Sequence, residues 1–130
     1  MKEVAMKIIV PTAGPVPDPR TAGYVVSIAK RLGAQLLVLC ILSKEETEAL
    51  GEQSLSLFVE NGREEKVSVN GIVKRGDLIP LIIGVAEENA ADLIILGVSR
   101  GEIVAEWLNA NAMAKTDIPV LLIPKWVRGA

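Results

Sequence analysis

Apolar residues along this chain gather in five short runs, separated by longer stretches in which apolar positions recur with a helical period. Four of the runs are nearly continuous in Leu, Ile and Val, which is typical of strands buried on both faces. The third run alternates around Val67 and Val69, which indicates a sheet edge with one partly wet face. The predicted strands cover residues 7–11, 35–42, 66–73, 92–97 and 119–124.

Two of the intervening helices have clear start signals. The first begins at the N-cap Asp18, with Pro19 at the first helical position, and ends at Gly33. A later helix begins at the cap Asp77, after a turn at Gly76, and tolerates Pro80 because backbone N–H groups of the first turn have no intrahelical partner. The inner face of the first helix is expected to consist of Ala22, Val25, Val26, Ala29 and Leu32.

The other two helices are less sharply bounded. One is predicted over residues 44–60, interrupted by Gly51 and closed by Asn61 and Gly62. Its expected core contacts are Leu50, Leu57 and Phe58. The last helix carries an apolar stripe made of Ile103, Val104, Trp107, Leu108 and Met113.

Strands and helices that alternate throughout, with short connections, predict the α/β class. The expected architecture is a doubly wound sheet of five parallel strands with right-handed crossovers and about four helices. No linker, repeat or low-complexity segment interrupts the pattern, so residues 1–130 are expected to form a single domain. Half of the residues are hydrophobic but only 3% are aromatic, so the core must consist of aliphatic side chains.

The net charge and the titratable residues exclude several classes of function. The net charge of −2 is spread over mixed acids and bases, so we expect no nucleic-acid partner. The chain has no histidine, which removes the commonest general base and metal ligand, and no metal site is expected. The one cysteine, Cys40, lies in the run LLVLCIL and is expected to be a buried apolar side chain rather than a reactive thiol.

No stretch predicts a membrane span or a targeting segment. The N-terminal sequence MKEVAMKIIVP places Glu3 and Lys7 among its apolar residues, so neither a signal peptide nor a transmembrane helix is expected. The protein is therefore expected to be cytoplasmic.

Three motifs give the chain a resemblance to the universal stress protein family over nearly its whole length. They are KIIVPTAGP at the first strand, VKRGD with the following helix and AADLIILG in the middle, and DIPVLLIP at the end. The middle block is the most specific of the three. The resemblance implies a strand order of 3-2-1-4-5, which would explain why the third strand alternates.

Many members of that family bind ATP, and the resemblance implies where. Their first strand ends in an Asp that contacts adenine, in a segment like PTD; here Pro11 and Thr12 match, but Ala13 stands at the Asp position. Their fourth strand leads into a glycine-rich loop that ends in a Gly-Ser or Gly-Thr pair. Anchoring the alignment on Pro119 places that pair on Glu106 and Trp107, whose bulk does not suit a close approach to phosphates.

The turn after Gly97 has a structural explanation of its own. Ser99 and Glu102, three residues apart, form a capping box that would occupy the backbone donors a phosphate would use. Glu102 would also repel an incoming phosphate. Arg100 is an argument for anion binding, because its guanidinium could hold a phosphate or carboxylate. The simpler interpretation is that Arg100 is a solvated surface charge. The candidate cleft consists of Pro11, Thr12, Ala13, Gly14, Ile41, Gly97, Ser99, Arg100 and Gly101.

These observations favour a non-catalytic, homodimeric universal stress protein-like domain in stress response or regulation, with no required cofactor and without tight ATP binding. One alternative is a sensor that binds ATP or AMP, and another is a weak nucleotide hydrolase. The last strand reads VLLI and carries none of the charges that normally protect a sheet edge. This edge indicates pairing with a second copy, as the resemblance also implies, through Val120, Leu121, Leu122, Ile123 and Trp126.

Overall fold

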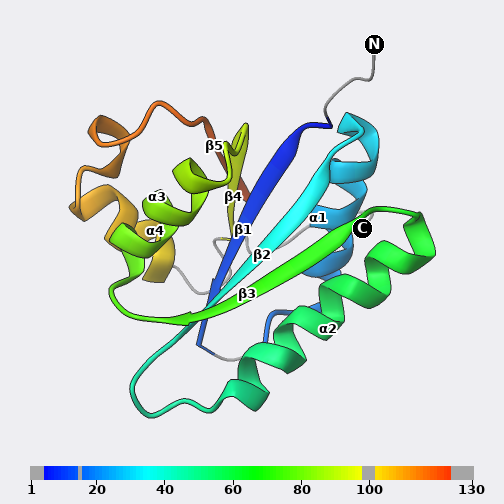
Figure 1. The fold of residues 1–130 in the computed structure, drawn as a ribbon, viewed down its shortest axis with the longest axis horizontal. Helices are drawn as coiled ribbons and strands as arrows, with labels where there is room; N and C mark the ends of the chain where they lie inside the picture. Colours follow the sequence, from blue (N-terminus) through cyan, green and yellow to red (C-terminus); the bar gives the residue numbers. More distant parts are fainter. Residues whose placement is uncertain (1–4, 15, 98–101, 124–130) are drawn as a thin grey trace.

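The chain folds into a parallel sheet with helices on both faces (Figure 1). The computed structural model describes residues 5–14, 16–97 and 102–123 of the 130. The strand order is β3-β2-β1-β4-β5, and every neighbouring pair is parallel, which confirms the predicted α/β architecture and the order implied by the resemblance. The strands are β1 (Lys7–Ala13), β2 (Gln35–Leu42), β3 (Val69–Arg75), β4 (Leu93–Gly97) and β5 (Val120–Ile123).

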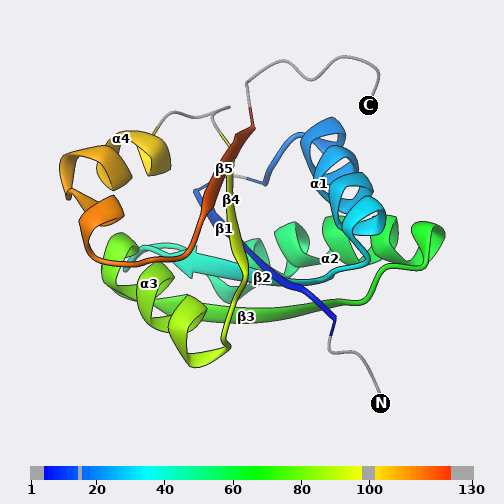
Figure 2. The same cartoon turned by 90° about the horizontal axis from the view of Figure 1, so that it is seen from above.

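The helices cover the sheet from both sides. Within the described residues they are α1 (Pro19–Leu32), α2 (Glu48–Glu65), α3 (Leu78–Glu88), α4 (Glu102–Asn109) and a short 3-10 helix, η1 (Ala112–Ala114). Figure 2 shows α1 and α2 on one side and α3 and α4 on the other. Each side has its own apolar cluster: Ile8, Val38 and Phe58 belong to the α1/α2 side, and Ile9, Leu39 and Trp107 to the α3/α4 side.

Helix α1 begins and ends where its sequence signals predict. The Asp18 carboxylate accepts a hydrogen bond from the Arg20 backbone N–H at 2.8 Å, and Gly33 ends the helix in the left-handed conformation with φ of 63°. The predicted inner-face residues are buried except Leu32, whose side chain is 47% exposed. Leu32 is the last residue of the helix, at the turn into β2, and it stays in solvent.

The predicted bounds of the second helix were wrong. The helix begins at Glu48 and runs through Gly51, Asn61 and Gly62 to Glu65, where Lys66 caps it in the left-handed conformation. Gly51 and Gly62 are buried because α2 lies so close to the sheet there. A Cβ on Gly51 would lie 3.3 Å from Val73 side-chain atoms, so these glycines permit close packing and do not interrupt the helix. Of the expected core contacts, Phe58 is buried, whereas Leu50 and Leu57 are half-buried.

Strand β3 starts later than the alternation in the sequence predicts. It begins at Val69, because Lys66 is still occupied with capping α2 and the Val67 N–H donates to the Gly62 carbonyl at 2.8 Å. As expected for an edge, every residue of the strand is at least partly exposed. The predicted edge is therefore confirmed, with a shifted start.

The last strand lies at the edge of the sheet, as the resemblance implied, but it was wrongly included among the strands buried on both faces. Leu121 and Leu122 are 39% and 48% exposed, whereas Ile123 is fully buried. The difference follows from the topology, because β5 pairs with β4 on one side and lies at the edge of the sheet. An apolar strand sequence therefore does not distinguish an edge from the middle of the sheet.

The apolar stripe predicted for the last helix is half correct. Trp107 is buried, and Ile103 and Val104 pack against the α3/α4 cluster. Leu108 is exposed although it lies within α4, one residue beyond the buried Trp107. Met113 is exposed in η1, which follows the end of α4 at Asn109. The predicted stripe assumed one uninterrupted helix.

Candidate functional site

The described pairing of β1 with β4 does not extend to the carboxyl ends of the two strands. The described pairing between these strands comprises Ile8 with Leu93 and Ile9 with Ile94. By contrast, β1 stays paired with β2 as far as Ala13, and β4 stays paired with β5 as far as Gly97. The chain leaves β1 for α1 on one face and β4 for α4 on the other, so this is the point where open α/β sheets form a ligand crevice.

The structure brings six of the predicted site residues to this edge. Pro11 and Thr12 are buried near the end of β1, Ala13 ends the strand, and Gly14 follows with φ of 79°. Ile41 of β2 is the register partner of Ala13, and both belong to the α3/α4 side of the sheet. Gly97 ends β4 and is half-buried.

The remaining three predicted site residues cannot be placed. Ser99, Arg100 and Gly101 lie outside the described residues, and so does the predicted capping contact of Ser99. The predicted N-cap of α3, Asp77, lies within the described residues. Asp77 has the extended backbone of an N-cap, but its side chain makes no cap hydrogen bond, contrary to the expectation.

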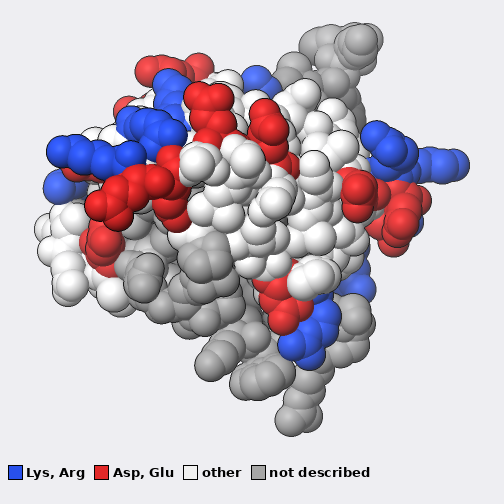
Figure 3. All heavy atoms as spheres, turned by 90° about the horizontal axis from the view of Figure 1, so that it is seen from below, with Lys and Arg blue, Asp and Glu red and all other residues white. Residues whose placement is uncertain are grey.

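The described part of the crevice is electrically neutral. None of Pro11, Thr12, Ala13, Gly14, Ile41 and Gly97 carries an ionisable side chain. Figure 3 views the molecule from below, the side toward which β1 ends in Figure 1, and shows an uncharged area bordered by acidic and basic side chains. What these six residues offer a ligand is backbone N–H and C=O groups and apolar contact.

Thr12 and Cys40 face away from Ala13, on the α1/α2 side of the sheet. The Cys40 thiol donates to the Gly51 carbonyl at 3.3 Å. Burial raises the pKa of this thiol above its ordinary value, and a hydrogen bond with the Thr12 side chain acts in the opposite direction. A buried thiol with a raised pKa is a poor nucleophile, in agreement with the sequence prediction for Cys40.

Arg75, at the end of the edge strand β3, contacts the loop that follows β2. Its guanidinium donates to the Ser43 carbonyl, and the Ser43 N–H donates to the Glu46 carboxylate at 2.8 Å. The end of β3 is thereby tied to the loop between β2 and α2. No motif in the sequence indicated this contact, since the two residues are 32 positions apart.

The described residues contain neither a candidate metal-binding cluster nor a membrane-spanning helix. No group of three or more His, Cys, Asp or Glu side chains that could hold a metal ion occurs among them. None of their helices combines the length and apolar character of a membrane span.

A sequence model of the universal stress protein family matches residues 5–124. The chain belongs to the universal stress protein family. A comparison with curated protein sequences found no significant match.

Solved structures of this family share the fold. A universal stress protein from Archaeoglobus fulgidus in complex with dAMP has a TM-score of 0.72 and 21% identity, with 93% of this chain and 99% of that chain covered. A universal stress protein in complex with cAMP has a TM-score of 0.71 and 19% identity, with 95% and 100% covered. A family member from Arabidopsis thaliana with AMP bound has a TM-score of 0.64 and 17% identity, with 95% and 94% covered.

Proposed function

We propose that this universal stress protein is a non-catalytic, homodimeric regulator that binds adenine nucleotides weakly. The observation that carries the proposal is Ala13, which stands at the end of β1 where the family resemblance implies an adenine-binding Asp. A methyl group can neither accept from the adenine amino group nor hold a charge. The neutral surroundings of Ala13 supply no substitute carboxylate among the described crevice residues.

The same residues support a role without catalysis. Hydrolysis of a phosphate ester needs a positioned water, usually on a metal, and a group that accepts its proton. The described crevice residues offer neither an acid nor a base, and the described residues contain no candidate metal cluster. We therefore assign the protein to regulation rather than to nucleotide hydrolysis.

Calorimetry tests this proposal directly. ATP and AMP are titrated into protein that was never exposed to added nucleotide, with and without Mg²⁺. The expected dissociation constants are on the order of a millimolar or weaker, corresponding to binding free energies of about −4 kcal/mol or less in magnitude. A dissociation constant far below a millimolar for either nucleotide, or a nucleotide that copurifies in stoichiometric amount, would contradict the proposal.

The second candidate function is a nucleotide sensor. It is favoured by the shared fold of the proteins solved with dAMP, cAMP and AMP, and by the described pairing of β1 with β4, which does not extend to their carboxyl ends. Glycines at the ends of both strands, Gly14 and Gly97, would allow a ligand to approach the backbone. Under this reading AMP raises the melting temperature by several degrees, whereas weak binding leaves it nearly unchanged.

Replacing Ala13 with Asp is expected to tighten AMP binding about tenfold, because a charged acceptor contributes roughly 1.5 kcal/mol to a hydrogen bond. The gain should be specific for a base that carries an amino donor. IMP, which lacks that amino group, serves as the control ligand, and Ala13→Asn tests whether charge is needed. Equal gains for AMP and IMP would show that the carboxylate does not contact the base.

The homodimer is proposed from the exposed edge of the sheet. Strand β5 leaves Leu121 and Leu122 partly in solvent on opposite faces of the sheet, and its outer edge pairs with no strand of the described residues. An uncharged edge of this kind favours pairing with an identical edge across a two-fold axis. Trp126, the remaining residue of the predicted interface, lies outside the described residues.

Replacing Leu122 with Lys is expected to raise the dimer dissociation constant roughly tenfold or more, because the interface would then bury a charge. The matched control is Leu32→Lys, since Leu32 is 47% exposed and Leu122 is 48% exposed. Light scattering at several micromolar concentrations measures both variants against the native chain. A native protein that is monomeric at these concentrations, or equal effects of the two substitutions, would contradict the proposed interface.

A further inference from the structure

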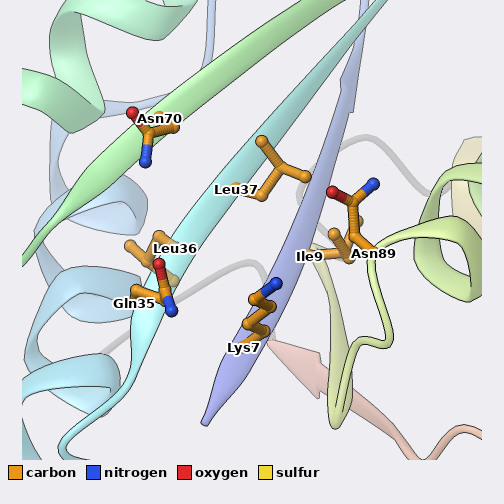
Figure 4. A pocket seen from close by; sticks show the side chains of 7 residues that line it. All are labelled: Lys7, Ile9, Gln35, Leu36, Leu37, Asn70 and Asn89. Carbon is orange, nitrogen blue, oxygen red and sulfur yellow. The ribbon is translucent and has the colours of Figure 1, made fainter. Parts of the chain in front are cut away.

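A pocket opens at the end of the sheet opposite the crevice. It lies where β1 and β2 begin, has a volume of about 190 Å³ and is lined from β1, β2, β3 and the residue that caps α3 (Figure 4). The register pairs Lys7 with Gln35 and Leu37 with Asn70. Because side chains alternate along a strand, these four residues and Ile9 share the α3/α4 side of the sheet.

The pocket exists because this part of a central strand is not covered by a helix. In β2 every residue is buried except Gln35 and Leu37, and both of these line the pocket. Strands inside a doubly wound sheet are normally covered on both faces. Here α3 ends at Glu88, and Leu37 remains half-buried with Ile9 beside it, so the pocket has an apolar floor.

The polar groups around this floor have free hydrogen-bonding capacity. Asn89 donates from Nδ2 to the Val85 carbonyl at 2.8 Å, which leaves its Oδ1 able to accept. The side chains of Lys7, Gln35 and Asn70 make no hydrogen bond or ion pair with other described residues. The Lys7 backbone is held in place, since its N–H donates to the Asp92 carboxylate at 2.8 Å and its carbonyl accepts from the Asp92 N–H.

These features define the chemistry of a ligand. Lys7 is the one ionisable side chain in the lining, so the pocket selects for an anion. The three carboxamides can donate to or accept from its polar end, and the half-buried Leu37, backed by the buried Ile9, can contact an apolar body. Ligand pockets for drug-sized molecules span about 300–1,000 Å³, and a water molecule takes about 30 Å³, so this volume suits a molecule of fewer than ten heavy atoms and not a nucleotide.

We propose that this pocket binds small aliphatic carboxylates, with the carboxylate on Lys7 and the hydrocarbon on Leu37. The site is separate from the crevice between β1 and β4 and holds whether or not the protein binds nucleotides. Its ligand enters from the end of the sheet where the strands begin.

Titration of the ¹⁵N-labelled full chain with isovalerate, followed by NMR at constant ionic strength, tests the proposal. The amide signals of Ile9, Leu37 and Asn70 are expected to shift with a dissociation constant on the order of a millimolar, reasonable for so small a ligand. Isovaleramide has the same shape without the charge and is expected to bind about fivefold more weakly, the upper range for a partly solvated ion pair.

Matched variants separate this site from general attraction to surface lysines. Lys7→Gln is expected to weaken isovalerate binding about fivefold, and Lys74→Gln, at the exposed far end of β3, is expected to leave it unchanged. Leu37→Phe fills the floor of the pocket and should abolish the shifts caused by isovalerate. The remaining amide signals should stay those of a folded protein. No shifts up to about 20 mM isovalerate, equal binding by Lys7→Gln and the native chain, or shifts centred on Ala13 and Gly97 would each overturn the proposal.

Discussion

Replacing Trp107 with alanine is expected to lower the free energy of unfolding by about 4 kcal/mol, within the range for large aromatic side chains in cores. Trp107 is the largest fully buried side chain described, with 2% of its surface exposed. It joins α4 to the cluster that contains Ile82, Ile94 and Leu96. Its indole N–H also donates to the Met113 sulfur at 3.3 Å, a contact that holds η1 against α4.

The neighbouring residue provides the control. Leu108 follows Trp107 on the same helix but is 64% exposed, so Leu108→Ala is expected to change stability by no more than about 0.5 kcal/mol. Urea denaturation of both variants and the native chain measures the difference, at one protein concentration because a dimer makes stability depend on concentration. Similar losses for the two substitutions would contradict the described packing of α4.

Replacing Gly62 with alanine is expected to destabilise the protein by about 2 kcal/mol, although alanine favours helices by about 1 kcal/mol over glycine. A Cβ at this position would lie 2.5 Å from Val69 Cγ2 and 2.8 Å from the Val67 carbonyl oxygen. The carbonyl belongs to the turn that leads from α2 into β3, so relief requires a backbone shift. The close approach of helix and strand therefore outweighs the gain in helix propensity.

Gly84 is the matched control because it is also a glycine inside a helix. It lies in α3, and a Cβ there would meet nothing within 4 Å. Gly84→Ala is therefore expected to stabilise the protein by up to about 1 kcal/mol. Thermal and urea denaturation of both variants should give changes of opposite sign. A stabilising Gly62→Ala would mean that α2 lies farther from β3 than described.

Capping and turn residues predicted helix ends correctly where the end depends only on neighbouring residues in the sequence. Asp18, Pro19 and Gly33 bounded α1 correctly, because capping and left-handed turn geometry depend on a few neighbouring residues. The same reasoning failed for Gly51 and Gly62. In isolation a glycine weakens a helix, but here it allows α2 to lie against the sheet, and that requirement comes from residues such as Val69 and Val73.

The candidate crevice was predictable only in part. Gly97 was placed correctly at the end of β4, since an apolar run followed by a turn residue marks a strand end. The apolar pattern ended the first strand at residue 11, two residues too early, whereas the resemblance correctly implied that it ends at Ala13. Pro11 is a sign in the sequence that the pairing of β1 with β4 weakens after Ile9, because proline has no N–H to donate. Only the structure shows that the backbone of Pro11 faces β4, on the side where the Lys7 carbonyl accepts from the Asp92 N–H. The bond from Arg75 to Ser43 also needed the folded arrangement.

The pocket around Lys7 had no signal in the sequence at all. Lys7, Gln35, Asn70 and Asn89 lie in four different segments, and each alone is an ordinary polar residue at a strand or helix end. Strand pairing brings the first three together, and the end of α3 adds the fourth. A site assembled from single residues of separate segments leaves no motif.

The sequence by itself determined the alternation of strands and helices and the family, because these follow from periodicity, capping and residue identity. Only the tertiary structure decided which residues of an apolar run or stripe remain exposed. Leu121 and Leu122 look like core residues in the sequence and are exposed because β5 is an edge. Whether an apolar residue is buried depends on which other elements pack against its strand or helix, and the residue's own segment does not specify those elements.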